Sequence, residues 1–159
     1  MMKISFDDTQ YASEKDIPWA PMGPDPRGGV DIRIFRVDSK NNRMAFLNRF
    51  HPGFIAMKHR HVGEVHAYTL TGRWHYFEYD WAAGPGDYVY EQPGTIHTLE
   101  AFPDNKGFTD VFFVIEGGLD VYDNDNNLLL AVTIPMFEEM YKQGLDALGL
   151  PYPTAILRD

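Results

Sequence analysis

The chain has 159 residues, of which 44% are hydrophobic and 14% aromatic, a composition typical of one folded globular domain. Its formal net charge of −9 and its lack of clustered Lys and Arg argue against nucleic acid as a partner. Because cysteine is absent, disulfides, thiolate metal sites and iron–sulfur clusters are excluded, and any metal must be held by His and carboxylate groups.

The sequence of the N-terminal region predicts neither a signal peptide nor regular secondary structure. Residues 1–8 are too acidic for a signal peptide, and the longest aliphatic run, 128–132, is too short to span a membrane. We therefore expect a cytoplasmic protein that does not bind membranes. Residues 18–29 contain four prolines and three glycines, which disfavour regular β-ladders, so an irregular arm is expected there.

From residue 31 onward, short stretches rich in Val, Ile, Phe and Tyr recur between turn signals, which predicts about nine strands. They cover residues 31–37, 44–48, 54–58, 65–70, 74–79, 88–91, 110–115, 119–122 and 128–133. The gaps are too short for crossover helices, which favours an antiparallel sandwich or barrel. The polar run 123–127 lacks the glycine and glutamate of a calcium loop and is expected to be a hairpin turn.

One amphipathic helix is predicted at about residues 135–148, since apolar side chains recur there at helical spacing and Gly149 and Pro151 follow. The apolar positions are Phe137, Met140, Tyr141, Leu145 and Leu148. The pattern as a whole predicts a single all-β domain over residues 1–159, with a barrel core at about 31–133 and this helix after it.

Three histidines are the strongest candidates for chemistry. His59 and His61 lie two residues apart on an expected strand, so they project to one face with backbones roughly 7 Å apart. His97 follows a Pro-Gly turn that would begin a new strand on the far side of a barrel. Because three neutral imidazoles suit iron, zinc, nickel or copper, we predict one divalent transition metal held by these residues.

These histidines and the glycines around them resemble the two motifs of the cupin superfamily. The matching residues are Gly53, His59, His61 and Gly72 in the first motif, and Gly86, Gly94 and His97 in the second. The resemblance implies a double-stranded β-helix, or jelly-roll, barrel. Many cupins add a glutamate ligand where this chain has Val65, so the site lacks a fourth protein ligand. Glu64, turned inward by a β-bulge, and His66 are the alternatives for that ligand.

The run from His59 to Leu99 also resembles the 2,4'-dihydroxyacetophenone dioxygenase and acetylacetone-cleaving cupins, which are three-histidine iron enzymes. That resemblance implies an Fe(II)-dependent dioxygenase that cleaves a carbon–carbon bond of a small β-diketone or hydroxyketone with O2. It also implies that Glu91, six residues before His97, lies close to the metal, with an exposed carboxylate as the alternative. Three neutral ligands would leave the metal charge for an anionic chelating substrate to compensate.

Several alternatives accompany this reading. Arg73 could orient an anionic substrate, although a solvated charge beside a turn is the commoner role of such an arginine. The function could instead be that of a non-catalytic metal sensor or of another cupin enzyme such as an isomerase, since a fold does not fix a reaction. The family implies self-association, so a homo-dimer or homo-tetramer is expected.

Overall fold

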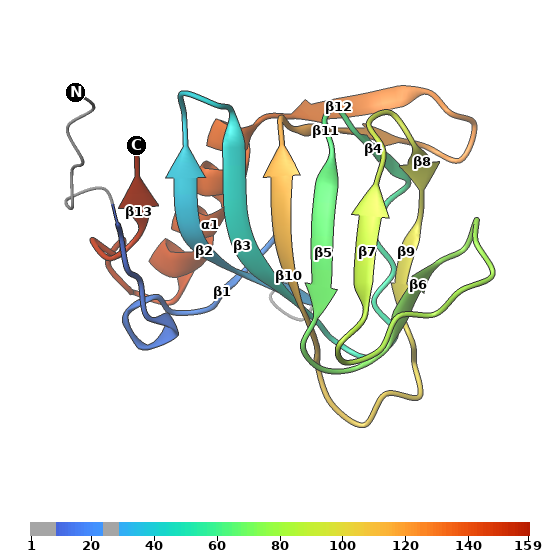
Figure 1. The fold of residues 1–159 in the computed structure, drawn as a ribbon, viewed down its shortest axis with the longest axis horizontal. Coiled ribbons are helices and arrows are strands. Elements are labelled where there is room, and N and C mark those ends of the chain that lie inside the picture. The colour runs from blue at the N-terminus through green and yellow to red at the C-terminus, as the bar shows by residue number, and fades with distance from the viewer. Residues whose placement is uncertain (1–8, 24–28) are drawn as a thin grey trace, which may run out of the picture.

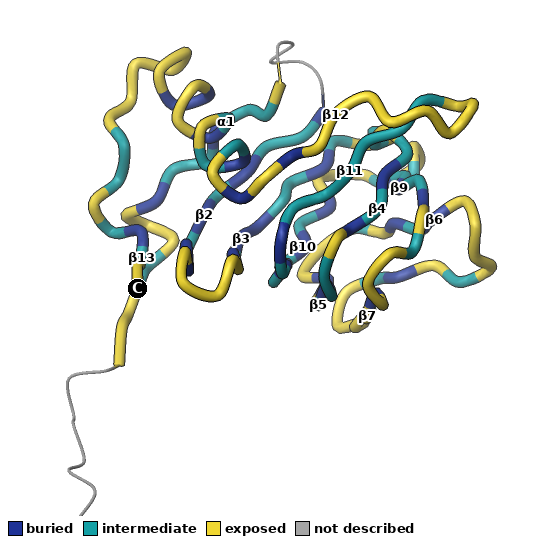
Figure 2. The backbone as a smooth tube through the Cα atoms, turned by 90° about the horizontal axis from the view of Figure 1, so that it is seen from above, coloured by how far each residue is buried: buried dark blue, intermediate teal, exposed yellow. Residues whose placement is uncertain are grey.

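Two β-sheets that face each other form the body of the protein, as the computed structural model of residues 9–23 and 29–159 shows (Figures 1 and 2). The larger sheet has the strand order β1-β2-β3-β10-β5-β7, with β13 paired to β2, and the smaller has the order β12-β11-β4-β8. A two-stranded sheet, β6-β9, lies beside them. Within the described residues every pairing is antiparallel except that of β13 with β2.

The strands of the larger sheet are β1 (Ala20–Pro21), β2 (Val30–Asp38), β3 (Arg43–Phe50), β5 (Val65–Thr69), β7 (Tyr88–Glu91), β10 (Thr109–Glu116) and β13 (Leu157–Arg158). Those of the smaller sheet are β4 (His59–His61), β8 (Ile96–His97), β11 (Leu119–Tyr122) and β12 (Leu128–Val132), while β6 spans Trp74–Tyr76 and β9 Leu99–Ala101. A short 3-10 helix, Glu14–Asp16, precedes them.

The core lies between the two sheets because the strands alternate in polarity. In β10 every second residue is buried, so Val111, Phe113 and Ile115 point inward. Phe113 is paired in register with Phe46 of β3, and the two rings stack with centroids 5.5 Å apart. The predicted barrel with a two-residue period is therefore confirmed.

Helix α1 (Ile134–Ala147) covers the end of the larger sheet next to β1 and β2 (Figure 2). Thr133 caps it by accepting a hydrogen bond from the Met136 N–H. Phe137, on the buried stripe, stacks on Phe46 with centroids 6.2 Å apart. The helix predicted at about residues 135–148 is confirmed, and each of its ends differs by one residue. In the described part of the chain, no helix is both long and apolar enough to cross a membrane.

Three expectations about local structure were wrong or incomplete. Residues 54–58 form no strand but a single bridge from Ile55 to Glu100, and regular pairing begins at His59. The strand expected at 74–79 stops at Tyr76, where a turn follows. Within the arm expected to be irregular, Ala20–Pro21 pairs with β2, and residues 24–28 lie outside the described part.

The hairpin expected at 123–127 is confirmed. It joins β11 to β12, and the Asp123 carboxylate accepts hydrogen bonds from the backbone N–H groups of Asp125 and Asn127. Asn126 adopts a φ of 66°, which asparagine tolerates better than most residues.

Candidate metal centre

Strands β4 and β8 bring the three histidines together. His59 is directly opposite His97 in this antiparallel pair, and strand alternation places His61 on the same face. One ring nitrogen from each lies within 4.8 Å of the others, and all three residues are buried. His97 was expected on the far side of the barrel; that was wrong, because β8 pairs directly with β4 in the same sheet.

Two of the motif glycines adopt backbone conformations that favour glycine. Gly94 adopts a φ of 83° in the turn before β8, and its N–H donates to the carbonyl of His61 at 3.0 Å. Gly72 has a φ of 74°, and a Cβ there would lie 2.1 Å from the Thr109 hydroxyl oxygen. The motif spacing therefore reflects backbone constraints as well as ligand positions.

The ring nitrogens are prepared to bind a cation. His59 Nδ1 donates to the Met57 carbonyl at 2.7 Å, which fixes its tautomer and leaves Nε2 as the acceptor. His61 Nδ1 and both nitrogens of His97 are buried without a hydrogen-bond partner among the described residues. Buried polar atoms are rarely left unpaired, and each of these two rings has a nitrogen that could bind a metal ion.

Burial also keeps His59 and His61 in the neutral form that binds metals. It lowers the pKa of His59, with a further contribution from the neighbouring His97. It lowers the pKa of His61 to about 4, despite the opposing effect of the Glu91 charge. His59 and His61 therefore need not lose a proton before they bind a metal ion at neutral pH.

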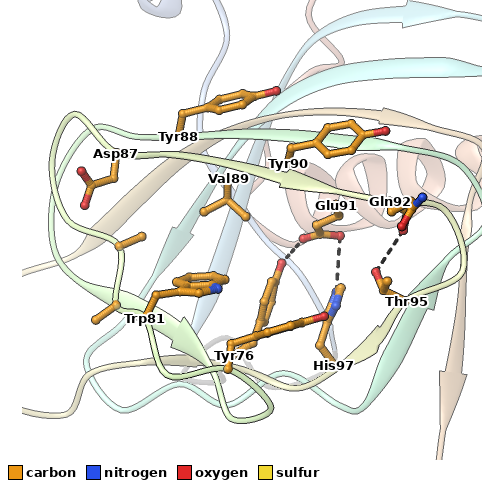
Figure 3. A pocket seen from close by; sticks show the side chains of 13 residues that line it. Tyr76, Trp81, Asp87, Tyr88, Val89, Tyr90, Glu91, Gln92, Thr95 and His97 are labelled. Atoms are coloured by element: carbon orange, nitrogen blue, oxygen red, sulfur yellow. Dashed lines mark hydrogen bonds and ion pairs between the residues drawn. The ribbon is translucent and has the colours of Figure 1, made fainter.

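Glu91 supplies a carboxylate from the neighbouring strand. It lies directly opposite Val65 in the β5–β7 pair, so it approaches the site from beside the position where many cupins carry glutamate. Its Oε2 lies 3.4 Å from His97 Nε2 and 3.8 Å from His61 Nε2. Figure 3 shows it pointing between Tyr76 and His97, on the other side of β7 from Tyr88 and Tyr90.

Charge and hydrogen bonds keep Glu91 ionised despite its burial. Burial alone would raise its pKa, but the neighbouring His97 and His61 rings and the Tyr76 hydroxyl lower it overall. The carboxylate oxygen that faces the histidines, Oε2, has no hydrogen bond within the described residues. Glu91 is thus placed to orient the histidines or to contact what they bind.

Tyr76 is a residue beside the cluster that no sequence motif singles out. It is buried, its ring stacks on His97 with centroids 3.9 Å apart, and its hydroxyl donates to Glu91 Oε1. Burial, with the nearby Glu91, raises its pKa well above the usual value, so it remains a donor. The only signal in the sequence was the two-residue alternation that gives Trp74 and Tyr76 one face of β6.

The alternative fourth ligands lie elsewhere. Glu64 and His66 are on the outer face of the larger sheet, where Glu64 Oε1 is 3.2 Å from His66 Nε2. Of the other histidines, His51 contacts Asp31 at 3.3 Å and His75 contacts Glu100 at 3.1 Å. Within the described residues, neither Glu64 nor His66 joins the group of side chains that could hold a metal ion, which consists of the three histidines.

Arg73 is not brought to the histidines. It is exposed, its guanidinium lies 4.5 Å from the centre of the Phe102 ring, and it lines neither of the cavities described next. Its role towards substrate stays a prediction that this placement does not favour.

Two cavities adjoin the cluster, and Tyr76 lines both. An apolar cavity of about 520 Å³ reaches His59 and His61 from between the two sheets. A more polar cavity of about 740 Å³ lies along the edge strand β7 and reaches Glu91 and His97 (Figure 3). The apolar cavity is lined by Met22, Gly23, Val30, Phe46, Asn48, Phe50, Phe54, Ala56, Met57, His59, His61, Tyr76, Leu99, Phe113, Leu119, Val121, Leu129, Leu130, Val132, Phe137 and Met140.

Comparison with known proteins agrees with this fold. Residues 7–120 match the model of the ChrR cupin-like domain, and no curated protein matches the chain. An RmlC-like cupin protein from Ralstonia eutropha JMP134 is 26% identical, with a TM-score of 0.83 over 93% of this chain and 94% of that one. A second protein from that organism, of unknown function with a cupin-like fold, is also 26% identical. Its TM-score is 0.83 over 98% of this chain and 96% of that one.

An acetylacetone dioxygenase from Acinetobacter johnsonii has a TM-score of 0.71 over 91% of this chain and 97% of that one, at 13% identity. At that identity the likeness shows the fold alone. The comparisons confirm the predicted fold class, a mostly β barrel with one C-terminal helix.

Proposed function

This chain belongs to the ChrR cupin-like family, and we propose that it is an iron(II)-dependent dioxygenase that cleaves a carbon–carbon bond of a small ketone. The substrate class is a β-diketone or a hydroxyketone that presents two oxygens to the metal. The observation that carries the proposal is the buried three-histidine cluster at an apolar cavity of about 520 Å³, with valine where many cupins carry a glutamate ligand.

The ligand set supports an anionic, chelating substrate. Three neutral imidazoles beside the single Glu91 carboxylate leave a divalent metal with a net positive charge, and an enolate or diketonate can compensate it. Iron(II), when bound by His59, His61 and His97, would relay electrons from the substrate, which is oxidised, to dioxygen, whose two oxygen atoms enter the cleavage products. Zinc, nickel and copper also accept three histidines, so the choice of metal rests on the proposed reaction.

The chain's own residues would position the substrate and exclude water. Burial and mostly apolar walls keep solvent from the histidines on the side of the apolar cavity. The Tyr76 ring packs against His97, and its hydroxyl holds Glu91 Oε1, so that Oε2 faces the histidines. This arrangement would fix the ring of His97 while leaving one carboxylate oxygen for a group of the substrate.

Oxygen uptake tests the proposal. Iron(II)-loaded protein is given a panel of β-diketones and 2-hydroxyacetophenones in an oxygen electrode, and products are identified by mass spectrometry. We expect oxygen consumption matched by cleavage products in the wild type and none in His97→Ala. If the iron-loaded wild type consumes no oxygen with any member of the panel, the dioxygenase proposal is wrong. Retention of zinc as the native metal without turnover would favour a metal-sensing module instead.

A further inference from the structure

The apolar cavity contains one polar side chain that the site described above does not use. On β3 the inward positions are Met44, Phe46, Asn48 and Phe50, and the other three are buried apolar residues. Asn48 lines the same cavity as His59 and His61. A polar group at an inward position of a strand needs hydrogen-bond partners or has a functional role.

Among the described residues, only the Nδ2 group of the Asn48 amide has hydrogen-bond partners. Its Nδ2 donates to the Asp31 carbonyl at 3.2 Å and lies 3.5 Å from Met22 Sδ, which fixes the orientation of the amide. No donor from residues 9–23 or 29–159 reaches its Oδ1. Asn48 therefore offers an oriented acceptor that a ligand in the cavity can use.

Asn48 and the histidines line the same cavity from different sheets. Asn48 belongs to the larger sheet, whereas His59 and His61 belong to the smaller sheet that faces it. A ligand held by the metal and extending across the cavity would present its far end to β3. The walls there are aromatic, with Phe50 stacked on Phe54 at 5.5 Å and against Phe113 at 6.5 Å, and flat rings pack well on such surfaces.

We propose that Asn48 is a specificity-determining residue, whose Oδ1 accepts a hydrogen bond from a hydroxyl group at the end of the substrate remote from the metal. This inference rests on the proposed function and narrows its substrate class to aryl ketones that carry a ring hydroxyl, in preference to purely aliphatic diketones. A ligand without the hydroxyl leaves the Asn48 acceptor unpaired in an apolar cavity, which weakens its binding.

Anaerobic binding of a matched ligand pair tests this inference without turnover. The probes are 2,4'-dihydroxyacetophenone and 2-hydroxyacetophenone, which differ by one ring hydroxyl, titrated by calorimetry into zinc-loaded protein. We expect the wild type to bind 2,4'-dihydroxyacetophenone, which has the ring hydroxyl, about tenfold more tightly than 2-hydroxyacetophenone. In Asn48→Leu the ratio of the two dissociation constants should fall to about one, because the acceptor is lost.

The control is Leu130→Ala, which changes an apolar residue of the same cavity and should alter both affinities alike while preserving their ratio. A wild-type ratio near one, or failure of both ligands to bind, overturns the inference even if the Asn48 variant does not fold. A tenfold ratio that persists in Asn48→Leu also overturns it. Because oxygen is excluded, a protein that shows the ratio but no oxygen uptake would contradict only the dioxygenase proposal.

Discussion

At neutral pH the buried His61 imidazole is uncharged, since burial lowers its pKa from 6.5 to about 4. Between those pH values the unfolded chain binds a proton at His61 that the folded apo-protein excludes, so acidification favours unfolding in this window. The contribution of neutral His61 to the free energy of unfolding should be fully present above pH 6.5, and it should be lost as the pH falls to 4.

We expect the free energy of unfolding of the apo-protein to fall over that range by roughly 3 kcal/mol more in the wild type than in His61→Gln. Urea unfolding at several pH values gives this difference. Equal pH slopes for the two proteins would show that His61 does not titrate as its burial implies.

Glu91 and Glu64 provide a matched pair of carboxylates beside β5. Glu91 faces the histidines, while Glu64 contacts His66 on the outer face. If Glu91 orients the ligands, Glu91→Gln should weaken metal affinity about 10–100-fold, whereas Glu64→Gln should leave it unchanged. Competition with a chromogenic chelator measures both. Equal affinities in the two variants would assign Glu91 no part in metal binding.

Spacing alone could predict some site residues but not others. His59 and His61 share a strand face by a two-residue period, and the turn before His97 marks the second motif. The position of Glu91 beside the cluster depends on its register opposite Val65, which local spacing does not specify. Asn48 was missed although its inward parity on β3 was visible in the sequence, because no motif drew attention to it.

At the scale of secondary structure, the turns of the barrel impose different demands on two glycines with positive φ. A Cβ at Gly72 would overlap Thr109, while a Cβ at Gly86 would meet nothing within 4 Å. Gly86→Ala should therefore cost roughly 1–2 kcal/mol of backbone strain, and Gly72→Ala more than about 3 kcal/mol because steric overlap is added.

Chemical denaturation of the two glycine variants measures these costs. Similar losses of stability would mean that the contact with Thr109 relaxes and that only the backbone conformation matters.

Elements with strong periodicity were predictable, and short ones were not. Helix α1 carries a clear pattern of buried residues over at least two turns, and β10 alternates clearly over its whole length. Strands β1, β8, β9 and β13 have two or three residues, too few for alternation to be recognised. Their pairing depends on neighbours distant in sequence, such as the β4–β8 contact that positions His97.

At the scale of the whole molecule, the outer face of the larger sheet carries exposed aromatic residues. Tyr68, Tyr88 and Tyr90 are 46%, 57% and 50% exposed on β5 and β7. The expected homo-dimer or homo-tetramer stays a prediction, and this face is where we expect two copies to meet, because tyrosine is enriched at interfaces.

Tyr68→Glu should then shift the protein towards a monomer in light scattering after size-exclusion chromatography. Tyr11→Glu, which changes a residue ahead of the short 3-10 helix that is 85% exposed, should not. A wild-type protein that is already monomeric, or a Tyr68 variant of unchanged mass, would contradict this location of the interface.

His59, His61 and His97 are proposed to hold one transition-metal ion together. Elemental analysis of protein purified without chelators tests it directly, with His75→Ala as a control because His75 lies outside the cluster. We predict about one transition-metal ion per chain in the wild type and in His75→Ala, and almost none in His97→Ala. A wild type that takes up no metal, or a His97 variant that retains a full equivalent, would contradict the account.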